Sequence, residues 1–282
     1  MHIIRIILII FVSCSSINQM NGQFTSKHSE NIYFSIVKNL KKECNKSTSN
    51  LLIKTAKFLI DTPYKSGTLE GEEEILRVNL QETDCIIFTE TCLAIAINAH
   101  NKIFLPDSLF STLKRLRYRN GIINSYKSRL HYTSEWILQG EKNGYFKDIS
   151  KDIGNNTVVE NKINFISSNP NCYKYLQDNP NEIKDFIEIE NNLNKNTFYY
   201  IPKKNVPEIL NKLKSGDIVC FNTTIKGLDI SHVGIIYKEK GKTTFIHASS
   251  KAKKVIIEPK GLVNYINDIK TNNGIRILRI TN

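Results

Sequence analysis

One cysteine of this chain stands where a helix would activate a nucleophile. Cys85 follows Asp84 and begins an apolar stretch that ends at His100, which predicts a helix buried on most sides with Asp84 as its N-cap. The unpaired N–H groups and the positive dipole end of such a helix favour a thiolate at its start. A small core hydrophobe is the commoner role for a cysteine considered alone, so the assignment of Cys85 depends on the residues around it.

Two histidines are predicted to meet on one face of a β-hairpin. His232 begins one β-branched run, and His247 lies near the end of the next. A two-residue turn at Glu239-Lys240 would place them directly opposite each other, and a turn at Lys240-Gly241 would make them diagonal neighbours. Either register brings together a base and a group that orients it, which with a cysteine gives the nucleophile–base–orienter arrangement. A metal site and a hydrogen-bonded core pair are the other interpretations of these histidines.

The order of the secondary-structure patterns indicates an α+β fold. Apolar residues recur at helical spacing in the first half, over residues 29–42, 49–60, 84–100 and 108–118. The last third consists of short β-branched runs separated by turn residues, at 216–222, 232–238, 243–248, 255–258 and 274–280. Helices followed by strands favour α+β over a doubly wound parallel sheet. The Asn- and Lys-rich segment 140–205 is expected to be a surface insertion.

Residues 1–23 are predicted to be a secretory signal peptide. Arg5 precedes an apolar run over residues 6–12, which is too short to span a bilayer because a spanning helix needs about 20 residues. Cleavage near Ser16 or Gln23 and lipidation of Cys14 in a loose lipobox are both open, and a buried N-terminal strand is the structural alternative. We expect an exported protein, periplasmic or envelope-associated, with residues 24–282 as one domain.

The cysteines are too few for a disulfide scaffold. Six are present, and five remain once the predicted signal peptide is removed, so at least one thiol is unpaired within the chain. No C-x-x-C pair occurs. Apart from Cys85, those that remain are expected to be structural: Cys44, Cys92, Cys172 and Cys220.

Charge suggests a partner of opposite sign. The 39 Lys and Arg residues against 27 Asp and Glu residues give the 282-residue chain a formal net charge of +12. This excess suits nucleic acid, acidic lipid or an acidic cell-wall polymer. The sequence contains no compact nucleic-acid recognition motif, and an exported address also disfavours nucleic acid, so we expect no nucleic-acid partner.

Several motifs together resemble the NlpC-type papain-like cell-wall hydrolases in order and spacing: Thr62-Pro63-Tyr64, Asp84-Cys85 with Phe88, Lys214-Ser215-Gly216-Asp217-Ile218, Ser231-His232-Val233-Gly234 and Ile246-His247-Ala248. The chain is more similar still to their N-acetylmuramoyl-L-alanine amidase-like branch, over nearly all of residues 24–282. The stretches that resemble signatures of that branch are 118–121, 128–136, 225–230 and 247–252.

The resemblance implies a papain-like α+β fold in which the buried helix with the nucleophilic Cys85 packs on an antiparallel sheet. It implies His232 as the base and His247 as the residue that orients it. The Cys85 N–H would form part of the oxyanion hole, and Tyr64 would line the cleft near the thiol.

The chain departs from the family pattern in the loop that borders this cleft. Ser66-Gly67-Thr68 replaces the usual glycine pair, and the loop from there to Cys85 is long. Bulky Ile86 and Ile87 follow the cysteine where small residues are common. These differences leave the triad intact and leave the choice of scissile bond open.

Further residues are candidates for binding substrate. The stretch 118–136 interleaves aromatic and basic side chains, which fits either a solvated helix pair or a sugar- and peptide-binding wall. Lys226 and Asp229 lie in the loop before His232, where they would hold charged substrate groups or be ordinary loop charges. The full candidate set is Tyr64, Arg129, His131, Tyr132, Trp136, Lys226, Asp229 and Ser231.

The leading hypothesis is hydrolysis of the amide between N-acetylmuramic acid and L-alanine in peptidoglycan or muropeptides, without a cofactor or metal, by a monomer. A stem-peptide endopeptidase that cuts after γ-D-glutamate is the alternative on the same fold. A zinc amidase would need three ligands, and none of the candidate histidines, His100, His131, His232 and His247, has a close H-x-H or H-E-x-x-H partner. A non-catalytic module that binds cell wall is the alternative of a different class.

Overall fold

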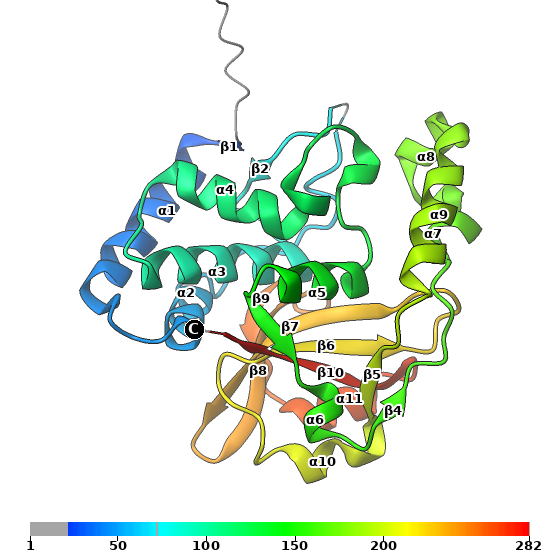
Figure 1. Ribbon diagram of the computed structural model, residues 1–282. Coiled ribbons are helices and arrows are strands. Elements are labelled where there is room, and N and C mark those ends of the chain that lie inside the picture. The colour runs from blue at the N-terminus through cyan, green and yellow to red at the C-terminus, as the bar shows by residue number, and fades with distance from the viewer. Residues whose placement is uncertain (1–21, 72, 282) are drawn as a thin grey trace, which may run out of the picture.

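The protein is described by a computed structural model that covers residues 22–71 and 73–281. The predicted signal peptide therefore lies outside the described residues, except for its last two positions. A layer of helices stacks on an antiparallel sheet (Figure 1). This arrangement confirms the α+β class expected from the order of patterns.

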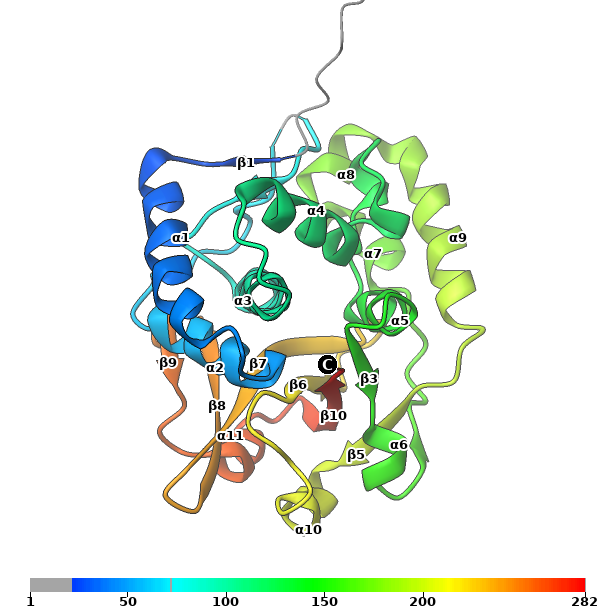
Figure 2. The same ribbon diagram turned by 60° about the vertical axis from the view of Figure 1, so that its left-hand side comes forward.

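The helical layer comes from the first half of the chain. It contains α1 (Lys27–Leu40), α2 (Thr48–Phe58), α3 (Cys85–His100) and α4 (Pro106–Arg117), which confirms the four predicted helical stretches. Figure 2 looks along α3 and shows it surrounded by α1, α2, α4 and α5 (Thr133–Lys142), with β7 (Ile230–Glu239) beneath. The apolar character of α3 on nearly all sides follows from this enclosure. Within the described ranges, no helix is long and apolar enough to cross a bilayer.

The main sheet has the strand order β4-β5-β10-β6-β7-β8-β9, and β3 pairs with a different part of β10. All of these pairs are antiparallel. The five runs predicted in the last third are confirmed as β6 (Ile218–Thr223), β7, β8 (Lys242–Ser249), β9 (Lys254–Ile257) and β10 (Asn272–Ile280). A separate parallel pair joins β1 (Gln23–Phe24) to β2 (Arg77–Val78).

Alternate residues of the sheet face two different hydrophobic cores. Val233, Ile235 and Ile246 belong to the core that contains α3. Ile236 and Phe245 belong to the core on the opposite face, which is covered by α6 (Ser150–Ile153), α10 (Val206–Ile209) and α11 (Leu262–Asp268). Since side chains alternate along a strand, His232 and His247 share the face of Ile236 and Phe245.

The turn of the β7–β8 hairpin decides between the two predicted registers. Glu239 pairs with Lys242, so the turn residues are Lys240 and Gly241, with φ of 49° and 79°. Two residues with positive φ are typical of the type I′ turns that suit the twist of a hairpin. The two histidines are therefore diagonal neighbours, as the second of the two registers predicted.

Residues 140–205, expected to be a surface insertion, form part of the sheet. Within this segment β3 (Phe146–Asp148) and β5 (Tyr199–Pro202) pair with β10, and β4 (Thr157–Val158) pairs with β5. Its helices α7 (Phe165–Ser168), α8 (Lys174–Asp178) and α9 (Ile183–Leu193) project to one side in Figure 1. Together with Tyr126 and Tyr132 they form a small separate hydrophobic cluster, which includes Leu176 and Phe186.

The contact between β5 and β10 leaves no space for a side chain at Gly274. An added Cβ there would lie 2.2 Å from the carbonyl oxygen of Ile201. Because a backbone atom cannot move aside easily, we expect Gly274→Ala to lower the free energy of unfolding by about 1–3 kcal/mol. The melting temperature, followed by circular dichroism, should fall by about 2–4 °C for each kcal/mol.

The matched control for this substitution is Lys270→Ala, at an exposed position shortly before β10. It should change the free energy of unfolding by no more than about 0.5 kcal/mol. A Gly274→Ala protein as stable as the wild type would contradict the close approach of β5 to β10.

Candidate active site

Cys85 is the first residue of α3, where the sequence placed it. The Asp84 side chain caps the helix and accepts a hydrogen bond from the Ile87 N–H at 2.9 Å. The Cys85 side chain is half-buried, so part of it remains accessible to solvent. The five described cysteines are all free, which agrees with the expected unpaired thiol.

The two histidines contact each other directly. His232 Nε2 lies 2.7 Å from His247 Nδ1, and the ring planes are at 84° to one another. His247 is 1% exposed, whereas His232 is half-buried. The contact leaves Nδ1 as the free ring nitrogen of His232 and Nε2 as the free ring nitrogen of His247.

The Cys85 thiol lies against β7 near His232, at the end of the β7–β8 ladder. The paired residues of the two strands extend from Glu239 back to Ile235, so Val233 stands outside the ladder. Its backbone N–H lies close enough to the Cys85 sulfur to stabilise a thiolate there. The thiol is thus held against β7, one residue from His232.

Burial determines the protonation states of this group. Burial, and after it the negative charge of Asp84, raise the pKa of Cys85 to about 12. Burial lowers the pKa of His232 to about 4, and burial together with His232 lowers that of His247 to about 3. The helix N–H groups favour a thiolate, as expected from the position of Cys85, but desolvation has the larger effect on its pKa. At neutral pH the group consists of a thiol and two neutral imidazoles.

Two tyrosines border the group from different elements. Tyr64 is half-buried, and burial and the nearby Cys85 raise its pKa, which places it beside the thiol as expected. Tyr265 of α11 packs on both histidines, with ring centroids 6.2 Å from His232 and 5.6 Å from His247. The sequence analysis missed Tyr265, since nothing in the sequence indicates that α11 covers this face of the sheet.

A cavity of about 580 Å³ opens beside His232 on the α11 face. Glu258, which follows β9, is also part of its wall and was not predicted. The register of β8 with β9 could have indicated it, because His247 pairs with Ile256 and Glu258 lies two positions further on the same face. The remaining polar lining residues are Ser249, Ser250, Lys251, Lys260 and Asp268.

Four of the predicted substrate-binding residues are engaged elsewhere. Arg129 is 5% exposed, and its guanidinium forms an ion pair with Glu70 at 2.8 Å. The His131 ring lies against the Tyr126 ring, and its Nε2 is hydrogen-bonded to the Tyr126 carbonyl oxygen at 2.9 Å. Burial and then the charge of Arg129 lower the pKa of His131 to about 3.

Tyr132 and Trp136 lie in the protein core. Tyr132 is 2% exposed and donates from its hydroxyl to Glu190 at 2.7 Å. Trp136 is 1% exposed and packs against Phe146 with ring centroids 4.9 Å apart. The aromatic residues in this stretch therefore hold α5 to its neighbours, and the structure gives these two no surface for a ligand.

The predicted substrate-binding residues in the loop before His232 differ in their exposure to solvent. Lys226 and Ser231 are exposed, and the Ser231 hydroxyl donates to the Phe221 carbonyl oxygen at 3.3 Å. Asp229 is 6% exposed and accepts the Ser134 N–H at 2.6 Å, near the start of α5. Burial raises the pKa of Asp229. Asp229 thus stabilises the N-terminus of α5, whereas Lys226 and Ser231 remain accessible.

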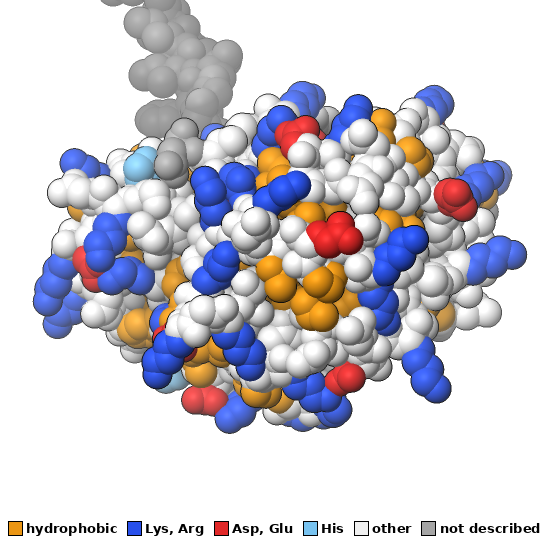
Figure 3. Space-filling model, turned by 90° about the horizontal axis from the view of Figure 1, so that it is seen from below, with side chains coloured by type: hydrophobic (Ala, Val, Ile, Leu, Met, Phe, Trp, Pro, Cys, Tyr) orange, Lys and Arg blue, Asp and Glu red, His pale blue; other side chains and the backbone are white. Residues whose placement is uncertain are grey.

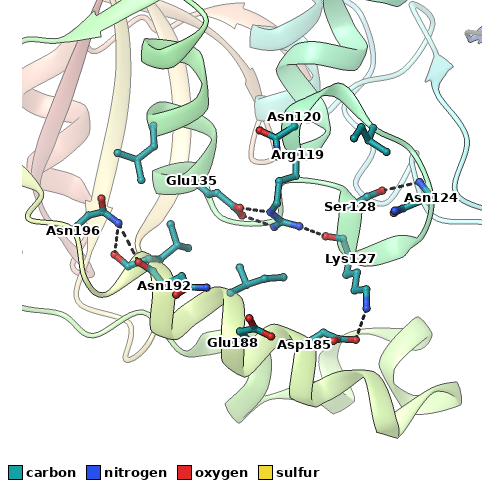
Figure 4. A pocket seen from close by; sticks show the side chains of 14 residues that line it. Arg119, Asn120, Asn124, Lys127, Ser128, Glu135, Asp185, Glu188, Asn192 and Asn196 are labelled. Atoms are coloured by element: carbon teal, nitrogen blue, oxygen red, sulfur yellow. Dashed lines mark hydrogen bonds and ion pairs between the residues drawn. The ribbon is translucent and has the colours of Figure 1, made fainter.

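A second pocket of about 610 Å³ lies between α9 and the segment that leads into α5. Figure 4 shows two ion pairs among its charged side chains, Arg119 with Glu135 at 2.6 Å and Lys127 with Asp185 at 2.7 Å. It contains none of the three residues predicted to do chemistry. Among the described residues, no group of three His, Cys, Asp or Glu side chains is placed to hold a metal ion.

Comparison with known proteins identifies the family. Residues 54–275 match the model of the N-acetylmuramoyl-L-alanine amidase-like family. The chain belongs to this family. An N-acetylmuramoyl-L-alanine amidase from Bacteroides uniformis is 32% identical, with a TM-score of 0.79 over 83% of this chain and 99% of that one. A protein from Bacteroides fragilis that carries a xylanase name is 35% identical, with a TM-score of 0.76 over 80% and 99%.

A more distant solved structure shares the fold of this amidase-like protein. It comes from Legionella pneumophila str. Philadelphia 1 and is 23% identical, with a TM-score of 0.67 over 90% of this chain and 95% of that one. A comparison with curated proteins finds no match.

The charge of Asp84 affects the ionisation of Cys85 in this amidase-like protein. Asp84→Asn keeps a helix-capping acceptor but removes the negative charge that helps to raise the pKa of the thiol. We therefore expect a larger thiolate fraction at neutral pH and alkylation of Cys85 by iodoacetamide that is about 3–10-fold faster. Peptide mass spectrometry measures the rate at each cysteine.

The exposed Cys172 supplies the control for this experiment within the same molecule. Its alkylation rate should be equal in the wild type and in Asp84→Asn. An unchanged rate at Cys85 would show that the Asp84 charge has no influence on the thiol.

Proposed function

We propose that this protein is an NlpC-type, papain-like cysteine amidase that hydrolyses the amide bond between N-acetylmuramic acid and L-alanine in peptidoglycan or muropeptides. The observation that carries the proposal is the His232–His247 contact of 2.7 Å, beside the residue that begins α3, in a chain of the amidase-like family. Cys85 is the nucleophile, His232 the base and His247 the residue that orients His232.

The neutral resting state makes His232 a general base. As the Cys85 sulfur attacks the carbonyl carbon of the muramic acid side chain, the thiol proton passes to His232 Nδ1 and a C–S bond forms. The C–N bond then breaks, and His232 returns the proton to the departing amino group of L-alanine. Water attacks the thioester, gives one proton to His232 and releases the acid, after which the sulfur takes that proton back.

The oxyanion of this reaction would lie at the N-terminus of α3. The backbone N–H of Cys85 is among the first N–H groups of the helix and has no partner within it. Such an N–H, in a site shielded from water, stabilises the negative charge that develops on the carbonyl oxygen. Tyr64, beside the thiol, forms the adjoining wall of the cleft.

Substrate charge fits the surface near the site. The charged side chains that line the cavity beside His232 are those of Glu258, Asp268, Lys251 and Lys260. Since Lys260 is paired with Asp268, Lys251 is the lysine of this wall placed to meet a substrate carboxylate. Figure 3 shows the underside of the protein, where Lys and Arg side chains outnumber acidic ones. Stem peptides carry carboxylates, so we assign this cavity to the peptide part of the substrate, with Lys226 and Ser231 at its approach.

We further propose that the protein is exported. The Gln23 N–H donates to the Leu76 carbonyl oxygen at 3.1 Å within the β1–β2 pair. Removal of a signal peptide at Gln23 would disrupt β1, so we place processing further upstream, either near Ser16 or at a lipid-modified Cys14. The mature protein would then act as a monomer in the periplasm or at the envelope.

Muropeptide digestion tests the function and the choice of bond. The wild-type protein should release free N-acetylmuramic acid termini and intact stem peptides, which mass spectrometry identifies. Cys85→Ala should lower kcat/KM by more than about 1,000-fold, because loss of a nucleophile disables the whole catalytic group. Cys92→Ala, which changes the other cysteine of α3, is the matched control and should remain active.

Three outcomes would contradict parts of this proposal. Activity of Cys85→Ala within tenfold of the wild type would refute the cysteine mechanism. Cleavage within the stem peptide after γ-D-glutamate would make the protein an endopeptidase on the same fold. Release of sugars from xylan, without cleavage of muropeptides, would match the name of the Bacteroides fragilis relative instead.

The roles of the two histidines should differ in degree. His232→Ala should lose nearly as much activity as Cys85→Ala, because His232 moves the proton at every step. His247→Asn should keep measurable activity, since an amide also orients an imidazole, and His247→Ala should keep less. The acid limb of wild-type kcat/KM should lie below pH 6.5, because burial lowers the pKa of His232 and the base is active only when unprotonated. An active His232→Ala beside an inactive His247→Asn would mean that the roles are reversed.

A further inference from the structure

The second ring nitrogen of His247 faces a buried carboxylate. His247 Nε2 lies 3.4 Å from Glu258 Oε2, and the two side chains are 1% and 8% exposed. Among the described residues, this nitrogen has no hydrogen-bond partner. Glu258 is therefore the group placed to accept a proton from His247, and it continues the series that runs from Cys85 through both histidines.

The Glu258 carboxylate is held in position by its surroundings. Its Oε1 accepts the Lys260 N–H at 3.0 Å, which leaves Oε2 toward His247. Its backbone N–H donates to the Phe245 carbonyl oxygen at 2.9 Å, so the residue is anchored to β8 beside His247. The Lys260 ammonium group forms its ion pair with Asp268 rather than with Glu258.

The tautomers of the two histidines follow from which nitrogens are engaged. A neutral imidazole has one N–H and one acceptor nitrogen. For His232 Nδ1 to accept the Cys85 proton, the proton of His232 must be on Nε2, where it is donated to His247 Nδ1. His247 Nδ1 is then an acceptor, so the proton of His247 must be on Nε2, which is the nitrogen that faces Glu258.

The opposite arrangement would disable the base. If His247 carried its proton on Nδ1, it would donate to His232 Nε2, and the His232 proton would be on Nδ1, directed at the thiol. A carboxylate cannot donate, so a group such as Glu258 at His247 Nε2 favours only the productive arrangement.

We propose that Glu258 is a positioning residue that selects the tautomers of both histidines and so keeps His232 Nδ1 free to accept the Cys85 proton. The proposal rests on the function proposed above. Glu258 does not touch the reacting atoms; its carboxylate also stabilises the imidazolium that His232 becomes during the reaction. Tyr265, the other titratable group that packs on both rings, keeps its proton because burial and the charge of Glu258 raise its pKa.

Nitrogen-15 NMR of the full chain labelled at histidine tests the tautomers without a substrate. The imidazole shifts of His232 and His247, assigned with His232→Ala and His247→Ala, should show the Nε2–H form of both rings in the wild type. Glu258→Gln keeps the size of the side chain but can also donate, so a substantial fraction of the Nδ1–H forms should appear. Glu239→Gln, a charge removal at the far end of the same hairpin, is the matched control and should leave the shifts unchanged.

Kinetics on one muropeptide supply the second readout. Glu258→Gln should lower kcat by about 10–100-fold, and KM should stay within about threefold of the wild type. Loss of a carboxylate that orients a metal-ligating histidine has an effect of about this size. Unchanged tautomers in Glu258→Gln, or kcat within twofold of the wild type, would overturn the proposal. An active Cys85→Ala protein would instead refute the cysteine mechanism itself, so the two failures can be told apart.

Discussion

The contact between His232 and His247 is the interaction on which the rest of the site depends. It requires the register set by the Lys240-Gly241 turn, since a slip of one residue would direct one ring to the α3 face. In the continuation of that register Gly234 lies opposite His247, and a Cβ at Gly234 would be 3.3 Å from the His247 Cβ and 2.7 Å from the Phe245 ring. A small residue two positions after His232 therefore leaves space for the paired ring.

Most of the fold could be predicted from the sequence where the elements are long and periodic. The four helices and the five C-terminal strands each carry a pattern over several residues, and the hairpin allowed only two registers. Segment 140–205 gave no such signal, because β3, β4 and β5 are two to four residues long and pair with strands distant in sequence. Strand pairing of that kind depends on the partner strand, which local sequence does not reveal.

For the candidate site, residue types and spacing indicated Cys85, His232, His247 and Tyr64. They did not indicate the pKa of the Cys85 thiol. The helix N-terminus lowers this pKa, but desolvation raises it, and the extent of desolvation depends on how the core packs. The burial of Trp136 and Tyr132 could not be predicted either. Aromatic residues among basic ones are typical of a surface that binds a ligand, but these two side chains lie in the core. Glu258 was missed since its contact with His247 joins residues that are distant in sequence.

The burial around Cys85 has a chemical consequence beyond hydrolysis. Oxidation of cysteine to sulfenic acid proceeds through the thiolate, so a thiol whose pKa is raised to about 12 reacts slowly with peroxide. In the proposed mechanism, substrate attack avoids this restriction because His232 removes the proton only as the new bond forms. For the nucleophile proposed above, this burial would slow oxidative inactivation.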